Sequence, residues 1–402
     1  MRTQFIVIGM PDNQCYISNN KEILDIINSN THFSGGKRHY ELLRPFLPVD
    51  AVWIDIKVPL ADVFDEYEYH RKIVVFASGD PLFSGFASTI LKRMPEAEVT
   101  IMPSFNSLQM LSHELKMSYE DMLMVPLTGR SWHELDRALI ENRMKIGILT
   151  DQVRTPASIA MRLLKYGFTQ YRMYIGEHLG NPEKQRVSRS LALSEVEEHS
   201  IESPNCVILQ RMYSDTTYRP LGIPDKMFEY LDGRERMITK APVRVLDMSA
   251  LMLPMCNHFW DIGFCTGSIS IEAKRQYPHL HIHAFEIRKE CWRLMEENSC
   301  RLGAPGIDVH IGDFMEEEVS DLPAPDAVFI GGHGGKLKEI VAKVARYLAP
   351  DGLLVFNSVS EESKKLFIDA VQETGLKLDD PLHITVGDYN PIVILKAFKE
   401  AK

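Results

Sequence analysis

Glycine and acidic residues in the second half of the sequence have the spacing of an adenosine-binding turn. An apolar run ending at Trp260 leads into Asp261-Ile262-Gly263-Phe264-Cys265-Thr266-Gly267, and a second run, His281 to Phe285, ends at Glu286. In a doubly wound α/β sheet, such glycines let the backbone approach a ligand, and the acid accepts hydrogen bonds from ribose hydroxyls. The pattern therefore predicts a cofactor that contains adenosine.

Two adenosine cofactors are compatible with this turn. A nicotinamide dinucleotide requires G-x-G-x-x-G for its pyrophosphate, whereas here Asp261 precedes Gly263 and three residues separate Gly263 from Gly267. An acid at that point repels a pyrophosphate but attracts the cationic amino-acid group of S-adenosylmethionine. A third strand pattern ends just before Asp313 and Phe314, where a carboxylate can meet an adenine amino group. The sequence favours the methyl donor, and the dinucleotide remains the alternative.

Cys265 stands in the middle of the turn. A cysteine side chain makes positive φ costly, whereas glycine adopts it freely. We therefore expect the backbone of Cys265 to lie in an ordinary region.

Composition restricts the class of protein. The 402 residues allow two or three domains with substantial cores, and 45% hydrophobic with 25% charged residues is typical of globular proteins. A net charge of −10 disfavours a nucleic-acid partner. The six cysteines form no C-x-x-C pair, which favours reduced thiols in a cytoplasmic protein. We expect no secretion signal and no membrane-spanning segment.

The sequence divides near residue 215. Residues 1–213 and 223–402 both alternate strand and helix patterns, so both are predicted to be α/β domains with largely parallel sheets. Residues 214–222 are polar and turn-rich, as in a linker. A short helix is expected over residues 225–231.

Polar loops follow several strand patterns of the first half. The apolar run 73–77 ends in Ser78-Gly79-Asp80-Pro81-Leu82-Phe83-Ser84-Gly85, and Gly35-Gly36-Lys37-Arg38-His39 follows another strand. Each such loop taken alone is typical of a turn or a helix cap. Because the loops recur between strands and helices, we expect them to line a cleft at one sheet edge.

These motifs resemble a known pair of families. Residues 1–213 are similar to tetrapyrrole methylases through the loops at 35–39 and 77–85 and through Gly176-Glu177-His178-Leu179-Gly180. Residues 223–402 resemble decarboxylating precorrin methyltransferases through Ile238-Thr239-Lys240, the turn at 261–267, the loop Gly331-Gly332-His333-Gly334-Gly335 and Asn390-Pro391. In this order, the two halves resemble the fused precorrin methyltransferases of cobalamin biosynthesis.

The resemblance implies a fold and an activity. It implies an N-terminal bilobal tetrapyrrole-methylase fold followed by a C-terminal Rossmann-like class I methyltransferase fold. The activity would be methylation of corrin-ring carbons 5 and 15, with loss of carbon dioxide from the ring-C acetate. The substrate would be a precorrin or its cobalt analogue, and the chain would form a homo-oligomer, with a tetramer associated with the C-terminal half.

The predicted site residues follow from the motifs and the resemblance. Catalytic roles are expected for His333, Lys240 and Asp80. No metal is expected, because His279, His281 and His283 alternate along a strand without a fourth ligand nearby. S-adenosylmethionine is expected to contact Thr239, Asp261, Gly263, Phe264, Cys265, Thr266, Gly267, Glu286, Asp313 and Phe314 in the second half, and Gly79, Asp80, Pro81, Leu82, Ser107 and Ala157 in the first.

Other functions remain open at this point. Both folds also serve methyltransferases that act on RNA or protein, although an acidic chain without a surface of basic and aromatic residues fits these less well. In that alternative, the N-terminal half would be a binding scaffold.

Overall fold

The computed structural model of the chain describes residues 2–213, 221–232, 234, 237–387 and 391–400. The chain forms two compact units. The first comprises Met1–Arg130, Met144–Met161 and Tyr171–Met212, and the second comprises Ser131–Arg143, Arg162–Gln170 and Tyr213–Lys402. In the described part of the chain, no helix is both long and apolar enough to cross a bilayer.

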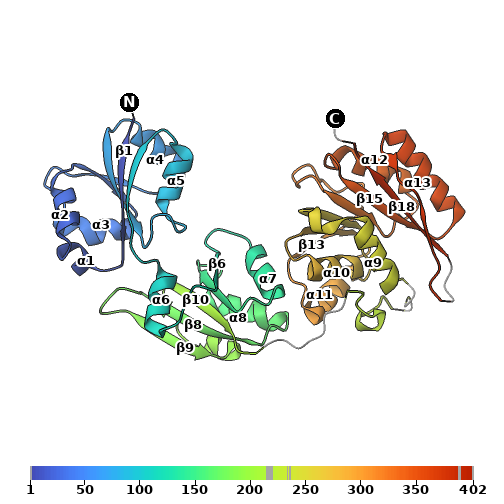
Figure 1. The fold of residues 1–402 in the computed structure, drawn as a ribbon, viewed down its shortest axis with the longest axis horizontal. Coiled ribbons are helices and arrows are strands. Elements are labelled where there is room, and N and C mark those ends of the chain that lie inside the picture. The colour runs from blue at the N-terminus through green and yellow to red at the C-terminus, as the bar shows by residue number, and fades with distance from the viewer. Residues whose placement is uncertain (1, 214–220, 233, 235–236, 388–390, 401–402) are drawn as a thin grey trace. The chain divides into compact units, whose positions relative to one another are not determined.

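The first sheet of the first unit is wholly parallel. Alternate residues of β1 (Gln4–Met10) face its two sides. Phe5 and Val7 pack against α4 (Leu60–Tyr67) and α5 (Phe86–Arg93). Ile8 and Met10 pack against α1 (Gln14–Ser18), α2 (Lys21–Asn28) and α3 (Lys37–Leu43). Figure 1 shows these helices on either side of the sheet. The strands, in the order β3-β2-β4-β1-β5, are β1 (Gln4–Met10), β2 (His32–Gly35), β3 (Val52–Asp55), β4 (Lys72–Ser78) and β5 (Glu98–Met102).

The second sheet of this unit is mainly antiparallel. Its strands, in the order β6-β7-β10-β8-β9, are β6 (Met122–Pro126), β7 (Lys145–Leu149), β8 (Tyr171–Glu177), β9 (Arg186–Leu191) and β10 (Asn205–Arg211). Only β6 and β7 pair in parallel, and β10 runs antiparallel to both of its neighbours. The prediction of largely parallel sheets is therefore wrong here. A buried apolar run does not encode the direction in which a strand pairs, and the short β8–β9 connection allows antiparallel neighbours.

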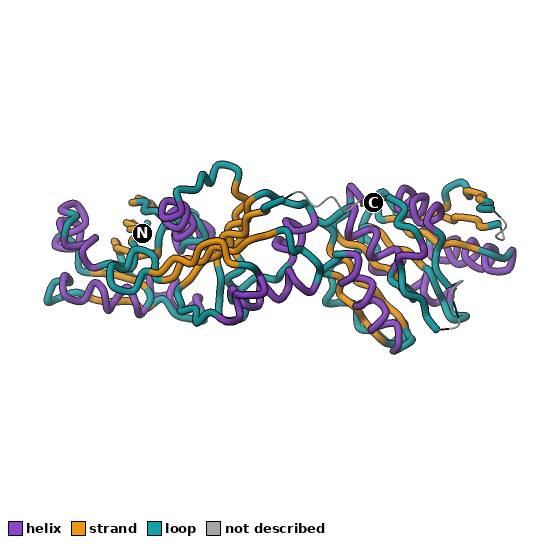
Figure 2. The backbone as a smooth tube through the Cα atoms, turned by 90° about the horizontal axis from the view of Figure 1, so that it is seen from below, coloured by secondary structure: helices purple, strands orange, loops and turns teal. Residues whose placement is uncertain are grey.

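The sheet of the second unit is parallel over its first five strands. In the order β13-β12-β11-β14-β15-β18-β16, the strands are β11 (His258–Ile262), β12 (His281–Glu286), β13 (Ile307–Ile311), β14 (Ala327–Ile330), β15 (Leu353–Ser358), β16 (Lys377–Leu378) and β18 (Ile392–Phe398), with β17 (Leu382–Ile384) beside β18. The strand β18 is antiparallel to β15. Figure 2 shows the strands of this sheet between helices. Trp260 and Ile262 belong to one apolar core of this unit, and Phe259 belongs to another.

The helices follow amphipathic stretches between these strands. In the first half they are α1 (Gln14–Ser18), α2 (Lys21–Asn28), α3 (Lys37–Leu43), η1 (Arg44–Phe46), α4 (Leu60–Tyr67), α5 (Phe86–Arg93), α6 (Ser107–Leu115), α7 (His133–Ile140), α8 (Pro156–Lys165) and η2 (Leu193–Glu198). In the second half they are η3 (Asp225–Met227), α9 (Ala241–Ala250), η4 (Leu253–Met255), α10 (Ser268–Gln276), α11 (Glu290–Leu302), α12 (Leu337–Tyr347) and α13 (Glu361–Thr374).

Two expectations about the junction have different outcomes. The helix expected over residues 225–231 is only the single 3₁₀ turn η3 (Asp225–Met227), because Phe228 has an extended backbone. Phe228 is buried in an apolar core of the second unit, and Tyr230 and Leu231 pack against that core partly buried. Residues 214–220 of the expected linker lie outside the described residues, as does Asn390. The domain limits at 213 and 223 stay a prediction.

Candidate functional site

A cavity of about 410 Å³ lies at the carboxyl edge of the second unit's sheet. After β11 the chain builds outward to β12 and β13, and then returns to place β14 on the other side of β11. Such a switch point separates the loops that follow neighbouring strands and leaves a crevice. The lining combines apolar and charged side chains with glycine backbone: Met237, Ile262, Gly263, Phe285, Glu286, Ile287, Arg288, Gly312, Asp313, Phe314, Gly332, His333, Gly334, Lys336 and Ile340.

The turn after β11 is built from three residues with positive φ. Gly263, Cys265 and Gly267 have φ values of 77°, 47° and 73°. The expectation of an ordinary backbone at Cys265 is therefore wrong. Its buried amide donates to a Glu286 oxygen at 3.0 Å, which holds the peptide in this orientation and offsets the cost of left-handed backbone. At Gly263 a β-carbon would lie 2.5 Å from the amide nitrogen of Gly332, so the two loops touch through their backbones.

The Glu286 carboxylate faces both the turn and the cavity. Oε2 accepts from the Cys265 amide and from Arg288 Nη2, at 3.0 and 2.8 Å. Oε1 accepts from the Arg288 amide and from Arg288 Nε, at 3.1 and 3.0 Å. The side chain of Glu286 is 2% exposed. The predicted ribose-binding acid thus lines the cavity, and a guanidinium already engages it.

Asp261 lies buried behind the turn. Its Oδ2 accepts a hydrogen bond from Ser270 Oγ at 2.6 Å, and its buried Oδ1 has no partner within the described ranges. Burial raises the pKa of Asp261 to about 7, with the nearby Glu286 charge contributing in the same direction. The carboxyl is therefore poised to accept a cationic group near neutral pH.

The remaining cofactor contacts predicted between Asp261 and Phe314 occupy two environments. Asp313 and Phe314 line the cavity, and Asp313 accepts from Lys336 Nζ at 2.5 Å and from the Met315 amide at 3.0 Å. Lys336 and the Met315 amide lower the pKa of Asp313. Phe264 and Thr266 belong to the turn and are buried. Of the predicted contacts in the turn only Gly263 lines the cavity, and those outside the lining are Asp261, Phe264, Cys265, Thr266 and Gly267.

The glycine loop after β14 brings His333 to the cavity. The loop is fastened to the turn because the amides of Gly331 and Gly332 both donate to the Ile262 carbonyl, at 2.8 and 3.3 Å. His333 Nδ1 accepts from the Gly335 amide at 3.2 Å, and the N-cap residue of α12 is Lys336. Burial lowers the pKa of His333. The imidazole is thus neutral at pH 7, and with Nδ1 accepting we assign the proton to Nε2.

Thr239 and Lys240 lie just before α9 and are not part of the cavity lining. The Thr239 carbonyl accepts from Arg244 Nη1 at 2.5 Å, and Lys240 Nζ lies 3.8 Å from Asp225. Arg244 is fully buried and also binds Glu272 at 2.7 Å, which ties this segment to α10. The structure therefore brings Glu286, Asp313 and His333 to one cavity and leaves Thr239 and Lys240 outside its lining.

A smaller cavity, of about 140 Å³, lies between the two sheets of the first unit. Of the residues predicted for this half, Gly79 and Ser107 line it, whereas Asp80, Pro81, Leu82 and Ala157 do not. Asp80 Oδ1 instead accepts the Leu82 amide at 2.8 Å within its own turn. The lining is Pro11, Asp12, Arg38, Ser78, Gly79, Phe105, Ser107, Met110, Gly176, Leu179, Pro204, Asn205 and Cys206.

Two sequence motifs of the first half meet at the end of β4. Ser78 Oγ accepts from Arg38 Nη2 at 2.8 Å and lies 3.0 Å from His39 Nε2. Burial, with Arg38 nearby, lowers the pKa of His39 to about 4, so this imidazole is neutral. Arg38 also lies 3.7 Å from Asp12. The expected cleft at the strand ends is present, with Arg38 as the cation on its lining.

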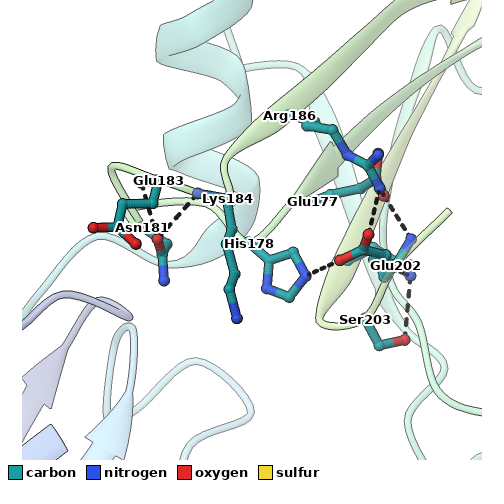
Figure 3. Close-up of polar contacts among 9 residues, drawn as sticks. Glu177, His178, Asn181, Glu183, Lys184, Arg186, Glu202 and Ser203 are labelled. Carbon is teal, nitrogen blue, oxygen red and sulfur yellow. Dashed lines mark hydrogen bonds and ion pairs between the residues drawn. The ribbon is translucent and has the colours of Figure 1, made fainter.

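The Gly176–Gly180 motif closes the opposite wall of this cavity. Figure 3 shows Arg186 between Glu177 and Glu202, and His178 directed at Glu202. Arg186 Nη2 lies 2.7 Å from Glu177 Oε2 and 3.3 Å from Glu202 Oε1, and His178 Nε2 lies 3.1 Å from Glu202 Oε2. The His178 amide donates to the Pro204 carbonyl at 2.9 Å. These bonds fix the segment that carries the cavity residues Pro204 and Asn205.

Sequence reasoning missed the cations of both sites. Arg288 and Lys336 line the larger cavity without having been assigned roles, and Arg38 was noted only as part of a motif. Arg288 follows the ribose acid by two residues, and this spacing is the signal that could have identified it. Over the described ranges, no three His, Cys, Asp or Glu side chains are grouped so as to hold a metal ion.

Comparison with known proteins connects both halves to one family. Residues 230–402 match a family model described as a precorrin methyltransferase domain. A Sinorhizobium protein named precorrin-6Y C(5,15)-methyltransferase (decarboxylating) is 30% identical over 374 residues, which span 91% of this chain and 87% of that protein. A Salmonella typhimurium protein named cobalt-precorrin-6B C(15)-methyltransferase (decarboxylating) is 32% identical over 183 residues, 42% of this chain and 94% of that protein.

A solved structure of a Geobacter metallireducens precorrin-6y C5,15-methyltransferase is 30% identical and covers 46% of this chain and 100% of its own, with a TM-score of 0.42. The sequence matches confirm the resemblance that the motifs indicated. The chain belongs to the family of decarboxylating precorrin-6Y C(5,15)-methyltransferases.

Proposed function

We propose that this chain transfers two methyl groups from S-adenosylmethionine to carbons 5 and 15 of precorrin-6Y or its cobalt analogue, and releases carbon dioxide from the ring-C acetate. One observation carries the proposal for the second unit. A turn with three residues of positive φ, a strand-end acid and a glycine loop all adjoin one cavity at the switch point of a parallel sheet. Family membership supplies the substrate class.

The residues of the larger cavity fit the parts of the cofactor. Glu286 would bind the ribose hydroxyls and Asp313 the adenine amino group, while Phe285, Ile287 and Phe314 provide apolar surface. Asp261 is not part of the cavity lining, so its proposed contact with the ammonium group of the cofactor rests on its unpartnered, buried Oδ1 alone. When bound, S-adenosylmethionine supplies an electrophilic methyl group, so the protein must chiefly align it with a nucleophilic ring carbon.

His333 would act on the ring substrate at the same cavity. A neutral imidazole with its proton on Nε2 can donate a hydrogen bond to a substrate carboxylate. To supply a proton, His333 would first have to take one up and become the imidazolium. The glycines on both sides of His333 leave room for a flat macrocycle. Lys240 stays a predicted carboxylate ligand, and its present neighbour is Asp225 at 3.8 Å.

The first unit would hold a second cofactor in a tetrapyrrole-methylase fold. Gly79 and Ser107 line its cavity, and we therefore propose them as cofactor contacts of this half. Asp80 shapes the loop through the Leu82 amide, and its predicted catalytic role remains a proposal together with the contacts of Pro81, Leu82 and Ala157.

The chain is also expected to form a homo-oligomer, and light scattering of the purified protein would test this.

The deciding experiment is mass spectrometry of the product formed from precorrin-6Y and S-adenosylmethionine. The proposal expects two methyl groups gained and one carbon dioxide lost. Glu286→Ala should weaken cofactor binding in the second unit by about 1.5–3 kcal/mol, because two ribose hydrogen bonds are lost. At a cofactor concentration near the Kd of the unaltered site, Glu286→Ala should therefore slow one methylation, and Asp80→Ala should abolish the other. A product with a single added methyl group from the unaltered protein would contradict the bifunctional assignment.

A further inference from the structure

Arg288 uses the capacity of Glu286 to accept hydrogen bonds. A carboxylate offers about four acceptor sites on its two oxygens. Glu286 already accepts the Cys265 amide at 3.0 Å and the Arg288 amide at 3.1 Å, together with Arg288 Nε at 3.0 Å and Nη2 at 2.8 Å. All of the sites are therefore occupied by donors of the protein itself.

A ribose diol brings two hydroxyl donors and therefore needs two of these sites. The two amides belong to the backbone, the Cys265 amide to the turn and the Arg288 amide to the second residue after the end of β12. Only the two guanidinium bonds can be released without changing the backbone. Nucleoside binding at Glu286 thus requires the Arg288 side chain to leave.

The Arg288 side chain has room to leave Glu286. It is 25% exposed, and it lines the cavity. Its Nη1 lies 3.9 Å from the Met237 thioether, which is a weak acceptor. Among the cavity-lining residues, Asp313 is the other acid, and Lys336 already contacts it at 2.5 Å. A released guanidinium would therefore need an acceptor that the ligand brings.

We propose that Arg288 is a positioning residue that couples the two ligands of this cavity: ribose displaces it from Glu286, and the released guanidinium then binds a carboxylate of the ring substrate. The planar fork of Arg matches a carboxylate with two hydrogen bonds. The cofactor consequently binds first and creates the receptor for the polycarboxylate. This inference rests on the proposed cofactor site at Glu286.

Calorimetry on the full chain with S-adenosylhomocysteine tests the displacement. Arg288→Met keeps the apolar stem and removes the competing donors, so the affinity of the second unit's site should rise at least roughly threefold. Arg293→Ala is the matched control, because it also removes one arginine but takes it from an exposed pair with Glu297. Glu286→Ala identifies which binding isotherm belongs to this site.

Titration with cobyrinic acid, a corrin polycarboxylate, tests the coupling. S-adenosylhomocysteine should raise the affinity for cobyrinic acid in the unaltered protein, and by the same factor cobyrinic acid should raise the affinity for S-adenosylhomocysteine. Arg288→Met should remove this mutual effect, and Arg288→Ala should repeat the result.

Different results would overturn the role of Arg288 and the cofactor site at Glu286. Arg288 variants that bind S-adenosylhomocysteine no more tightly than the unaltered protein, while Glu286→Ala loses the site, would overturn the role of Arg288 and leave the proposed function standing. A Glu286→Ala variant that binds two S-adenosylhomocysteine molecules normally would overturn the cofactor site itself.

Discussion

Asp261 should make the second unit less stable as the pH rises. Burial raises its pKa to about 7 in the folded protein, whereas an unfolded aspartate has a pKa near 3.8. Between these values the folded state keeps a proton that the unfolded state has lost, so stability falls as pH increases from about 4 to about 7. With about 1.4 kcal/mol for each unit of pKa difference, this loss amounts to about 4 kcal/mol.

Asp261→Asn should remove this loss. Asparagine has nearly the shape of the protonated carboxyl and cannot ionise, so the variant should match the unaltered protein near pH 4 and exceed it at pH 8. Hydrogen exchange of β11 amides, followed by mass spectrometry across this pH range, measures the local opening free energy. Asp313→Asn is the control, because Lys336 lowers the pKa of Asp313 and its contribution is instead lost as the pH falls.

Identical pH profiles for Asp261→Asn and the unaltered protein would refute this reasoning. They would mean that the Asp261 carboxylate ionises without cost in the folded state. A gain at pH 4 equal to the gain at pH 8 would point to packing rather than to charge. Ser270→Ala sharpens the test, because it removes the 2.6 Å bond to Oδ2 that favours the charged form.

Three further changes test the turn and its support. Gly263→Ala places a β-carbon 2.5 Å from the Gly332 amide at a φ of 77°, so thermal unfolding should show a loss of more than about 1 kcal/mol, together with weaker S-adenosylhomocysteine binding. Cys265→Gly should keep that binding in calorimetry, whereas Cys265→Val should lose it, because a β-branched residue resists a φ of 47°. Arg244→Ala leaves Glu272 buried without its ion-pair partner and should lower the free energy of unfolding in denaturant by about 3–5 kcal/mol. The double variant Arg244→Ala/Glu272→Ala should lose less stability than the two single variants added together.

The central strands of the second unit were predictable because a strand that is buried on both faces has a continuous apolar sequence. The apolar runs before Asp261 and Glu286 became β11 and β12, and the glycine turn between them directs the chain into α10. The antiparallel second sheet of the first unit was not predictable in the same way. The apolar pattern of β8 and of β10 would be the same in a parallel and in an antiparallel pair, so the pattern alone does not predict the direction of pairing.

Two site predictions failed to place a side chain in its cavity because that side chain binds a nearby group outside the cavity. Asp80 resembled a catalytic acid, but a carboxylate two residues before an amide is equally suited to close its own turn, as it does with Leu82. Lys240 was expected at the cavity, yet Asp225 lies 3.8 Å away on the preceding segment. In both cases a local partner of suitable chemistry accounts for the side chain's position, and motif spacing does not reveal such partners.

At Glu286 the same kind of spacing predicted a residue that does line the cavity, and its role as the ribose acid stays a prediction. Its carboxylate accepts the Cys265 amide in the turn and also faces the cavity, so one side chain both shapes the turn and presents an acceptor to a ligand. The same hydrogen bond explains how Cys265 occupies a left-handed backbone conformation, because Glu286 holds the Cys265 amide in that orientation. Asp261 holds the other side through Ser270, the third residue of α10. The acids and glycines of the motif therefore depend on one another through the backbone, and this dependence requires that they keep their spacing.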